Sequence, residues 1–205
     1  MGRSQLVSYN AGGGFAMSVQ IVRHKFTVDD YHRMAKAGIL SEDDRVELIE
    51  GEIVAMAPIG DRHAGTVDFL AESFFRYLGD QVQVRVQSPI RLGEHSELQP
   101  DLALLKRRPD FYRDRHPSPQ EVLLSVEVAE TSPEYDREVK IPLYARFGVS
   151  EVWLVDLEAG AVEVYRGPSG EGYQQQEVLR RGEVISPKAF PEIELPVGEI
   201  LGKAR

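Results

Sequence analysis

The order of hydrophobic and polar positions predicts two helices in the N-terminal half of the chain. Apolar residues recur at helical spacing over residues 61–78, and Gly79 ends that element. A shorter helix is predicted over residues 28–37, because Thr27 and Asp30 have the spacing of a capping box. The helix at residues 61–78 places an apolar stripe on one side, which gives it an inward face.

Extended segments are predicted where short aliphatic and β-branched runs lie between turn residues. Residues 46–56 have the pattern of a tight hairpin around Glu50 and Gly51. Residues 93–99 are polar and predict a loop. The other predicted strands are residues 82–86, 88–92, 101–105, 122–130, 151–157 and 161–166. The run at 122–130 is almost continuously apolar, which is typical of a strand covered on both faces.

A third helix is predicted over residues 134–147, and Pro142 should kink or split it. Helices, hairpins and strands therefore alternate along the chain, which favours an α/β class fold with one mixed sheet flanked by helices. Residues 1–17 contain a glycine run and show no periodicity. We expect a disordered extension at residues 1–17 and a single domain at residues 18–205.

Composition then excludes several classes of site. The 205 residues include no cysteine, which excludes disulfides and thiolate zinc sites and leaves only oxygen or imidazole as metal ligands. We expect a reducing, cytoplasmic compartment and no membrane span, because no apolar run approaches 18 residues. A net charge of -9 argues against bulk electrostatic coating of nucleic acid, although it leaves room for a local basic groove.

Two acidic residues stand out on predicted buried strands. Glu127 lies within the apolar run at 122–130, and a buried acid requires a partner or a metal ion. Asp101 begins another strand. Two carboxylates on neighbouring strands would share a hard cation such as Mg²⁺, which also binds water and substrate phosphate. The alternative is a pair of strand-end salt bridges with arginines such as Arg91 or Arg137.

The predicted helix after the Glu127 strand carries a polar face. Asp136, Lys140 and Tyr144 recur at four-residue spacing, so they lie along one side of it. An ammonium group near paired acids would orient an attacking water or stabilise negative charge that develops on phosphate. The alternative for Lys140 is a surface ion pair with Asp136, which contributes little to stability.

These residues, in this order, resemble a nuclease signature. Gln99-Pro100-Asp101 followed by Val126-Glu127-Val128-Ala129 is similar to the PD-(D/E)XK pattern, in which an Asp and a Glu bind Mg²⁺ and a Lys completes the site. More narrowly, residues 26–201 resemble the Uma-type family of restriction-endonuclease-like proteins. The segments that carry this resemblance are RVELIEGEIVAMAP, QPDLALL, SVEVAE, the stretch from Tyr135 to Tyr144, and GVSEVWLVD.

The resemblance implies a restriction-endonuclease-like core and a DNA endonuclease that depends on Mg²⁺, with Mn²⁺ able to substitute. Asp101 and Glu127 would be the metal ligands. The superfamily's usual Lys position holds Ala129, whereas the Uma-type pattern has a Lys on the following helix, which maps onto Lys140. Glu47 maps onto a Glu that the family has before the apolar hairpin. It would either bind the metal ion directly or contact the residues that bind it. A homodimer is the simplest way to cut both strands of a duplex.

Several of these residues also have alternative interpretations. Glu47 has the charged neighbours typical of a solvated hairpin, and His63, on an apolar helix face, is typical of a core histidine as well as of a ligand. Trp153 is expected in the core. A basic cluster follows the Asp101 strand and would contact phosphate, or form a solvated loop partly cancelled by acids; it contains Lys106, Arg107, Arg108 and Arg113.

Two further function classes stay open at this level. A non-catalytic module with the nuclease fold, which binds nucleic acid or another protein, is favoured by Ala129 and by the acidic balance. A glycosidase would use Asp101 and Glu127 as acid and base. It ranks below the nuclease because aromatic residues make up only 8% of the chain and several occupy core-periodic positions.

Overall fold

The computed structural model describes residues 23–41 and 43–203, so the predicted extension at residues 1–17 lies outside the described residues. A six-stranded mixed sheet forms the centre, in the order β10-β9-β8-β7-β6-β3. Only β7 and β8 pair in parallel. The strands are β3 (Val82–Val86), β6 (Leu102–Lys106), β7 (Val122–Ala129), β8 (Glu151–Asp156), β9 (Ala161–Ser169) and β10 (Gly172–Arg180). The prediction of a mixed sheet flanked by helices is confirmed.

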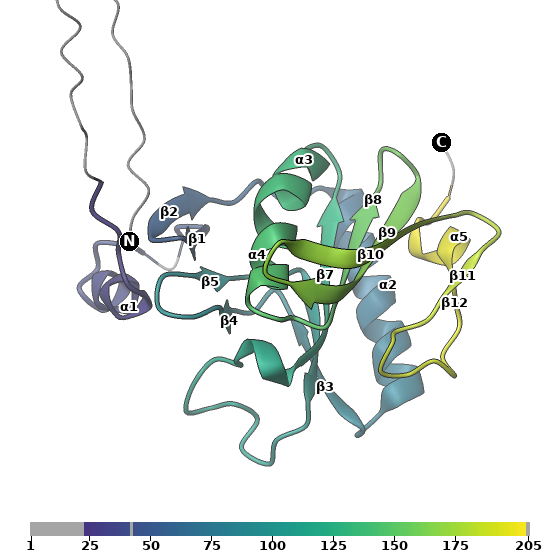
Figure 1. Cartoon of the computed structure of the whole chain (residues 1–205), viewed down its shortest axis with the longest axis horizontal. Helices are drawn as coiled ribbons and strands as arrows, with labels where there is room; N and C mark the ends of the chain where they lie inside the picture. Colours follow the sequence, from purple (N-terminus) through teal and green to yellow (C-terminus); the bar gives the residue numbers. More distant parts are fainter. Residues whose placement is uncertain (1–22, 42, 204–205) are drawn as a thin grey trace, which may run out of the picture.

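Alternation along β7 decides which helix each side chain meets. Val126 and Val128 pack in one apolar cluster with helix α2 (Asp61–Leu78) and with the fully buried Trp153. Ala129 packs in the cluster on the other side of the sheet, with helix α4 (Ile141–Arg146). Figure 1 shows these two helices on opposite faces of the sheet. Because successive strand residues point to opposite faces, the side chain at position 127 faces α4.

The predicted helix at 134–147 is three consecutive pieces. A short α3 (Pro133–Tyr135) leads into a π-helical turn, η2 (Asp136–Lys140), which is followed by α4. Pro142 has no N–H to donate and its ring crowds the preceding turn, and the wider π turn accommodates this break. The expected disruption at Pro142 is therefore confirmed, and it places Lys140 in a buried position at the end of the π turn.

A second, four-stranded sheet of order β2-β1-β5-β4 packs beside the first. The predicted hairpin is confirmed as β1 (Val46–Ile49) and β2 (Glu52–Ala55). The predicted loop at 93–99 is wrong in part, because β5 (Glu97–Leu98) lies within it and pairs with β1 and β4 (Ile90–Arg91). Two residues are too few to show a strand period, so this pairing has no signature in the sequence.

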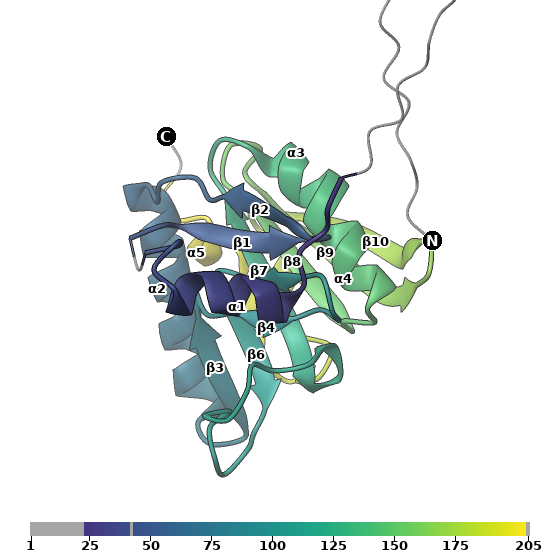
Figure 2. The same cartoon turned by 90° about the vertical axis from the view of Figure 1, so that its left-hand side faces the viewer.

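The remaining elements complete the edges of the molecule. Figure 2 shows helix α1 beside the β1–β2 hairpin, and the Tyr31 hydroxyl donates a hydrogen bond to the Val46 carbonyl. The predicted capping box at Thr27 is confirmed. Within the described residues, none of the helices combines the length and apolar character needed to cross a bilayer. The other elements are α1 (Val28–Lys36), η1 (Pro119–Glu121), β11 (Val184–Ile185), β12 (Leu195–Pro196) and α5 (Val197–Ile200).

Replacing Gly51 with alanine should destabilise the protein by about 1–3 kcal/mol. Gly51 has a φ of +80°, and an added Cβ would lie 2.7 Å from the Cβ of Lys25 and 3.0 Å from the Phe26 carbonyl oxygen. Urea unfolding monitored by circular dichroism measures the effect. Gly170→Ala is the matched control, since an added Cβ there meets nothing within 4 Å. An equal, small change in both variants would contradict the prediction.

Candidate active site

Glu127 lies near the carboxyl end of β7, buried under the polar face of the η2–α4 segment. Glu127 is only 2% exposed. The Tyr144 hydroxyl donates a hydrogen bond to Oε1 at 2.5 Å, and the Lys140 Nζ lies 3.3 Å from Oε2. The polar helix face predicted from the spacing of Lys140 and Tyr144 therefore meets the acid predicted on the strand.

Lys140 joins several carboxylates instead of forming one surface pair. Its Nζ lies 3.1 Å from Glu47 Oε1 and 3.8 Å from Asp136 Oδ1, in addition to the contact with Glu127. Burial alone would lower the pKa of Lys140, but the negative charges of these three neighbours raise it well above its usual range. The alternative of an isolated surface pair with Asp136 is wrong, because Lys140 is buried and has three acidic partners.

Glu47 is part of the same cluster. It lies on β1 and is 4% exposed, so the alternative of a solvated hairpin charge is wrong. Its Oε2 accepts a hydrogen bond from the backbone N–H of Gln99 at 3.2 Å. The segment after β5 thus holds the carboxylate of Glu47, whose other oxygen lies 3.1 Å from Lys140.

Asp101 lies directly before β6, next to Glu127 on the neighbouring strand. Its Oδ2 accepts a hydrogen bond from the backbone N–H of Val128 at 2.9 Å and lies 3.0 Å from His63 Nε2. His63, on α2, therefore reaches the site through this carboxylate, and its buried Nδ1 has no hydrogen-bond partner among the residues that the structure describes. Gln87 Nε2 lies 3.4 Å from Asp101 Oδ1.

Arg91 and Arg137, named above as alternative partners of these acids, pair elsewhere. Arg137 pairs with Asp156 at 2.5 Å and with Glu163 at 2.6 Å, on β8 and β9. Arg91 pairs with Asp29 at 3.4 Å. Both arginines therefore hold other parts of the fold together, and the acids of the cluster meet Lys140 and His63 instead.

The cluster contains more acid than base. A cleft of about 570 Å³ is lined by five carboxylates and three basic groups, namely Glu47, Asp101, Glu127, Glu130 and Asp136 against Arg45, His63 and Lys140. Burial raises the pKa of Glu127 well above its usual value, and burial raises the pKa of Asp136 to about 6, with Lys140 opposing both shifts. Removal from water disfavours the charged form of each acid, and one lysine does not balance the group.

These donors suit a hard divalent cation, which prefers carboxylate oxygen and would supply the missing positive charge. They are not arranged as a preformed cage. Within the described part of the chain, the oxygens of Asp101, Glu127 and Glu47 do not form a set of three that all lie within 4.8 Å of one another. The assignment of Asp101 and Glu127 as metal ligands therefore stays a prediction.

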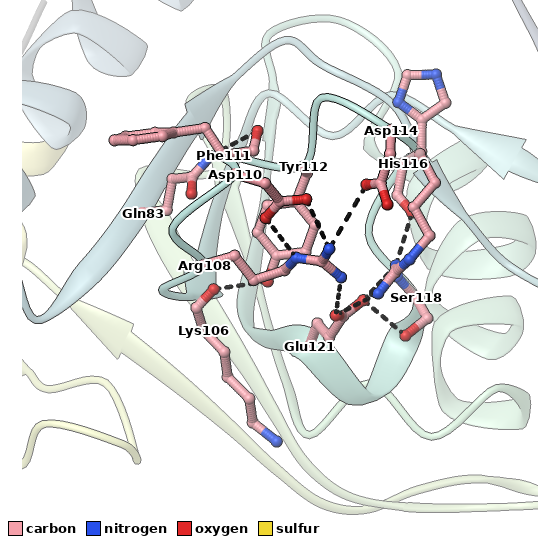
Figure 3. A network of polar contacts seen from close by, with 11 residues as sticks. Gln83, Lys106, Arg108, Asp110, Phe111, Tyr112, Asp114, His116, Ser118 and Glu121 are labelled. Carbon is pink, nitrogen blue, oxygen red and sulfur yellow. Dashed lines mark hydrogen bonds and ion pairs between the residues drawn. The ribbon is translucent and has the colours of Figure 1, made fainter.

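The basic cluster lies at the other end of β6 from Asp101. Figure 3 shows the Arg108 guanidinium among acidic side chains, with contacts of 2.6 Å to Asp110, 3.5 Å to Asp114 and 3.5 Å to Glu121. Two other arginines lie over the Phe111 ring, namely Arg107 and Arg113. Among the residues that the structure describes, the cleft lining includes none of these four predicted phosphate contacts: Lys106, Arg107, Arg108 and Arg113. The structure does not bring them together with the acids.

Sequence reasoning missed the glutamines that support the carboxylates. Gln87 follows β3 and has a φ of +43°, and its backbone N–H donates to the Asp101 carbonyl at 3.0 Å. Gln99 Nε2 donates to the Gln87 carbonyl at 2.8 Å. Neither contact has a sequence signal, because a positive φ in a non-glycine residue depends on its surroundings.

The chain is similar to a known protein family. The model of the Uma2 family, described as "Putative restriction endonuclease", matches residues 28–198. The chain belongs to this family. None of the curated proteins matches the chain.

A solved structure is also similar to this Uma2 family member. It is described as a putative nuclease belonging to DUF820, from Anabaena variabilis ATCC 29413, and it is 17% identical in sequence. The TM-score is 0.67, and the match covers 86% of this chain and 97% of the other. At this identity the likeness shows a shared fold, which is that of a protein described as a nuclease.

Proposed function

We propose that the protein is a metal-dependent endonuclease that hydrolyses DNA phosphodiester bonds at the cleft between β6, β7 and the η2–α4 segment. The observation that carries the proposal is the convergence of Glu47, Glu127 and Lys140 on this cleft, with Asp101 on the adjacent strand. Membership of a family described as a restriction endonuclease supports the reaction class.

Asp101 and Glu127 would hold Mg²⁺, or Mn²⁺ in its place. When bound, the ion would polarise a phosphoryl oxygen and lower the pKa of a water molecule. Lys140 would orient the attacking water and stabilise the charge that develops on the phosphate. Glu47 holds the ammonium group of Lys140 at 3.1 Å, and Tyr144 fixes the carboxylate of Glu127.

Ala129 explains why the lysine has to come from a helix. Its side chain is 6% exposed and packs with the apolar cluster beneath α4. Lys140 replaces the missing strand lysine because the π turn directs it to the same carboxylate, 3.3 Å from its Nζ. DNA as the substrate, a homodimer that cuts both strands and a cytoplasmic location belong to the same proposal.

A second candidate function is a non-catalytic module that binds nucleic acid or a protein. The favouring observation is that Lys140 has three acidic partners and both oxygens of Glu127 have donors, so a metal ion would have to displace or share existing contacts. This alternative has the same fold but no catalytic activity.

Cleavage of DNA should require a divalent ion and Asp101. We expect the wild-type protein to cut plasmid or oligonucleotide DNA with Mg²⁺ or Mn²⁺ and to lose this activity in EDTA. Asp101→Asn should lower the rate by about 100-fold, since a ligand charge is lost. Gel electrophoresis of the products measures the rates, and Asp68→Asn, at an exposed position on α2, is the matched control.

Two outcomes would contradict the proposed endonuclease function. One is equal cleavage by wild type and Asp101→Asn. The other is absence of cleavage with either ion, together with salt-dependent DNA binding, which would support the non-catalytic module.

A further inference from the structure

A second cluster of metal-binding side chains lies away from the acidic cleft. His32 on α1, Glu97 on β5 and His116 in the loop before η1 each offer one ligand atom, and these atoms all lie within 4.8 Å of one another. The three residues line a separate cavity of about 750 Å³. Three segments far apart in the sequence thus bring two imidazoles and one carboxylate to the same point.

Glu97 is a buried acid with an incomplete set of partners. It is 4% exposed, and its Oε1 lies 2.7 Å from His32 Nε2. Its Oε2 is buried and has no hydrogen-bond partner within residues 23–41 and 43–203. Arg91 lies opposite Glu97 across the β4–β5 pair, but its guanidinium contacts Asp29 and the Gly93 carbonyl instead. A buried carboxylate in this position favours a cation close to its free oxygen.

His116 is also incomplete. Its buried Nδ1 meets no hydrogen-bond partner in the described part of the chain. Its ring meets that of His32 edge-on, with the ring centroids 5.8 Å apart. Burial lowers the pKa of His116, Arg85 and Arg91 act in the same direction, and Glu97 opposes them. A neutral imidazole nitrogen without a hydrogen-bond partner is a ligand atom for a metal ion.

The loop that carries His116 is held rigidly. Arg115 makes two contacts of 2.7 Å with the carboxylate of Glu121, and Glu121 also accepts hydrogen bonds from Ser118. Arg108 joins the same network (Figure 3). The imidazole of His116 points away from the carboxylate of Glu121 in this view. Arg108 and Arg115 therefore hold the loop that carries His116, and both guanidinium groups are paired with acids of this loop.

We propose that His32, Glu97 and His116 bind a divalent transition-metal ion of the zinc class. Two imidazoles and one carboxylate are a typical zinc donor set and differ from the all-oxygen set of Mg²⁺ or Ca²⁺. Tetrahedral nitrogen and oxygen ligands of zinc lie roughly 3.4 Å apart, so small side-chain rotations would close the cluster on an ion. The cavity leaves space for a water molecule as a fourth ligand, and the ion would fasten α1 and the loop to β5.

The test uses the full chain, freed of metals with a chelator, and ZnCl₂ alone as the probe. Isothermal titration calorimetry should show one strong site, and Co²⁺ in its place should give the visible absorption of a four-coordinate ion. His116→Ala and Glu97→Gln should each weaken Zn²⁺ binding by about 100-fold or more, because each removes a ligand. His24→Ala, at an exposed histidine, should leave it unchanged.

The acidic cleft could also bind Zn²⁺. A variant that lacks the carboxylates of the cleft distinguishes binding at the two sites. In the double variant Asp101→Asn/Glu127→Gln, binding to the His32–Glu97–His116 site should persist with the wild-type affinity. Circular dichroism checks that each variant folds, and His32→Ala serves in place of Glu97→Gln if that variant does not. Loss of binding in the double variant, or full binding in His116→Ala, would overturn the proposal, as would the absence of Zn²⁺ binding to wild type.

Discussion

Replacing Lys140 with methionine should destabilise the protein by about 3–5 kcal/mol, as expected for a buried ion pair that loses one partner. Methionine has nearly the same length, so the packing below α4 is retained. The carboxylates of Glu47 and Glu127 would then be buried without the ammonium group that lies 3.1 and 3.3 Å from them. Each must keep an unpartnered charge or take up a proton, and both states cost free energy. Urea unfolding monitored by circular dichroism measures the loss.

The effect of pH and of a second substitution on the stability loss shows whether unpaired acids cause it. Buried acids without a counter-charge have raised pKa values, so the folded variant binds more protons than the unfolded chain and its stability falls as pH rises from about 4 to 7. The deficit of Lys140→Met should therefore be smaller at acidic pH. Adding Glu127→Gln should recover part of it. Lys188→Met, at an exposed lysine, is the control. A deficit that is independent of pH would point to lost packing instead.

The parts of the site that the sequence reveals lie on long, regular elements. Asp101, Glu127 and Lys140 stand out because a buried strand and a polar helix face both have strong periodic patterns. Successive side chains of a strand point to opposite faces of the sheet, and this alternation places Glu127 below the helical segment that carries Lys140 and Tyr144. These contacts are confirmed by the distances between the residues.

The parts that the sequence does not reveal depend on short pairings and on loop contacts. Glu47 is buried because the two-residue strand β5 pairs with β1, and such a strand has no period to detect. The basic residues after β6 have the composition of a phosphate-binding patch, yet Arg108 is matched by Asp110 and Glu121. The sequence shows which charged groups the loop contains. Which acid pairs with which arginine depends on the conformation of the loop.

Replacing Glu127 with glutamine should separate catalysis from folding. The amide keeps an oxygen that can accept the hydrogen bond of Tyr144, but it loses the charge that would hold a divalent ion. We expect cleavage of plasmid DNA with Mg²⁺ to fall by about 100-fold or more, which corresponds to about 3 kcal/mol of transition-state stabilisation.

Stability should behave in the opposite way in this variant. Burial raises the pKa of Glu127, so ionised Glu127 destabilises the folded state above the ordinary pKa of a glutamate, and the neutral amide removes that cost. Lys140 keeps Glu47 and Asp136 as partners at 3.1 and 3.8 Å. At pH 7 the midpoint of urea unfolding should therefore stay at the wild-type value or rise, as it should for the exposed control Glu177→Gln, which keeps full activity. A large fall in stability would mean that the charge of Glu127 holds the fold together, and undiminished cleavage would remove Glu127 from the metal site.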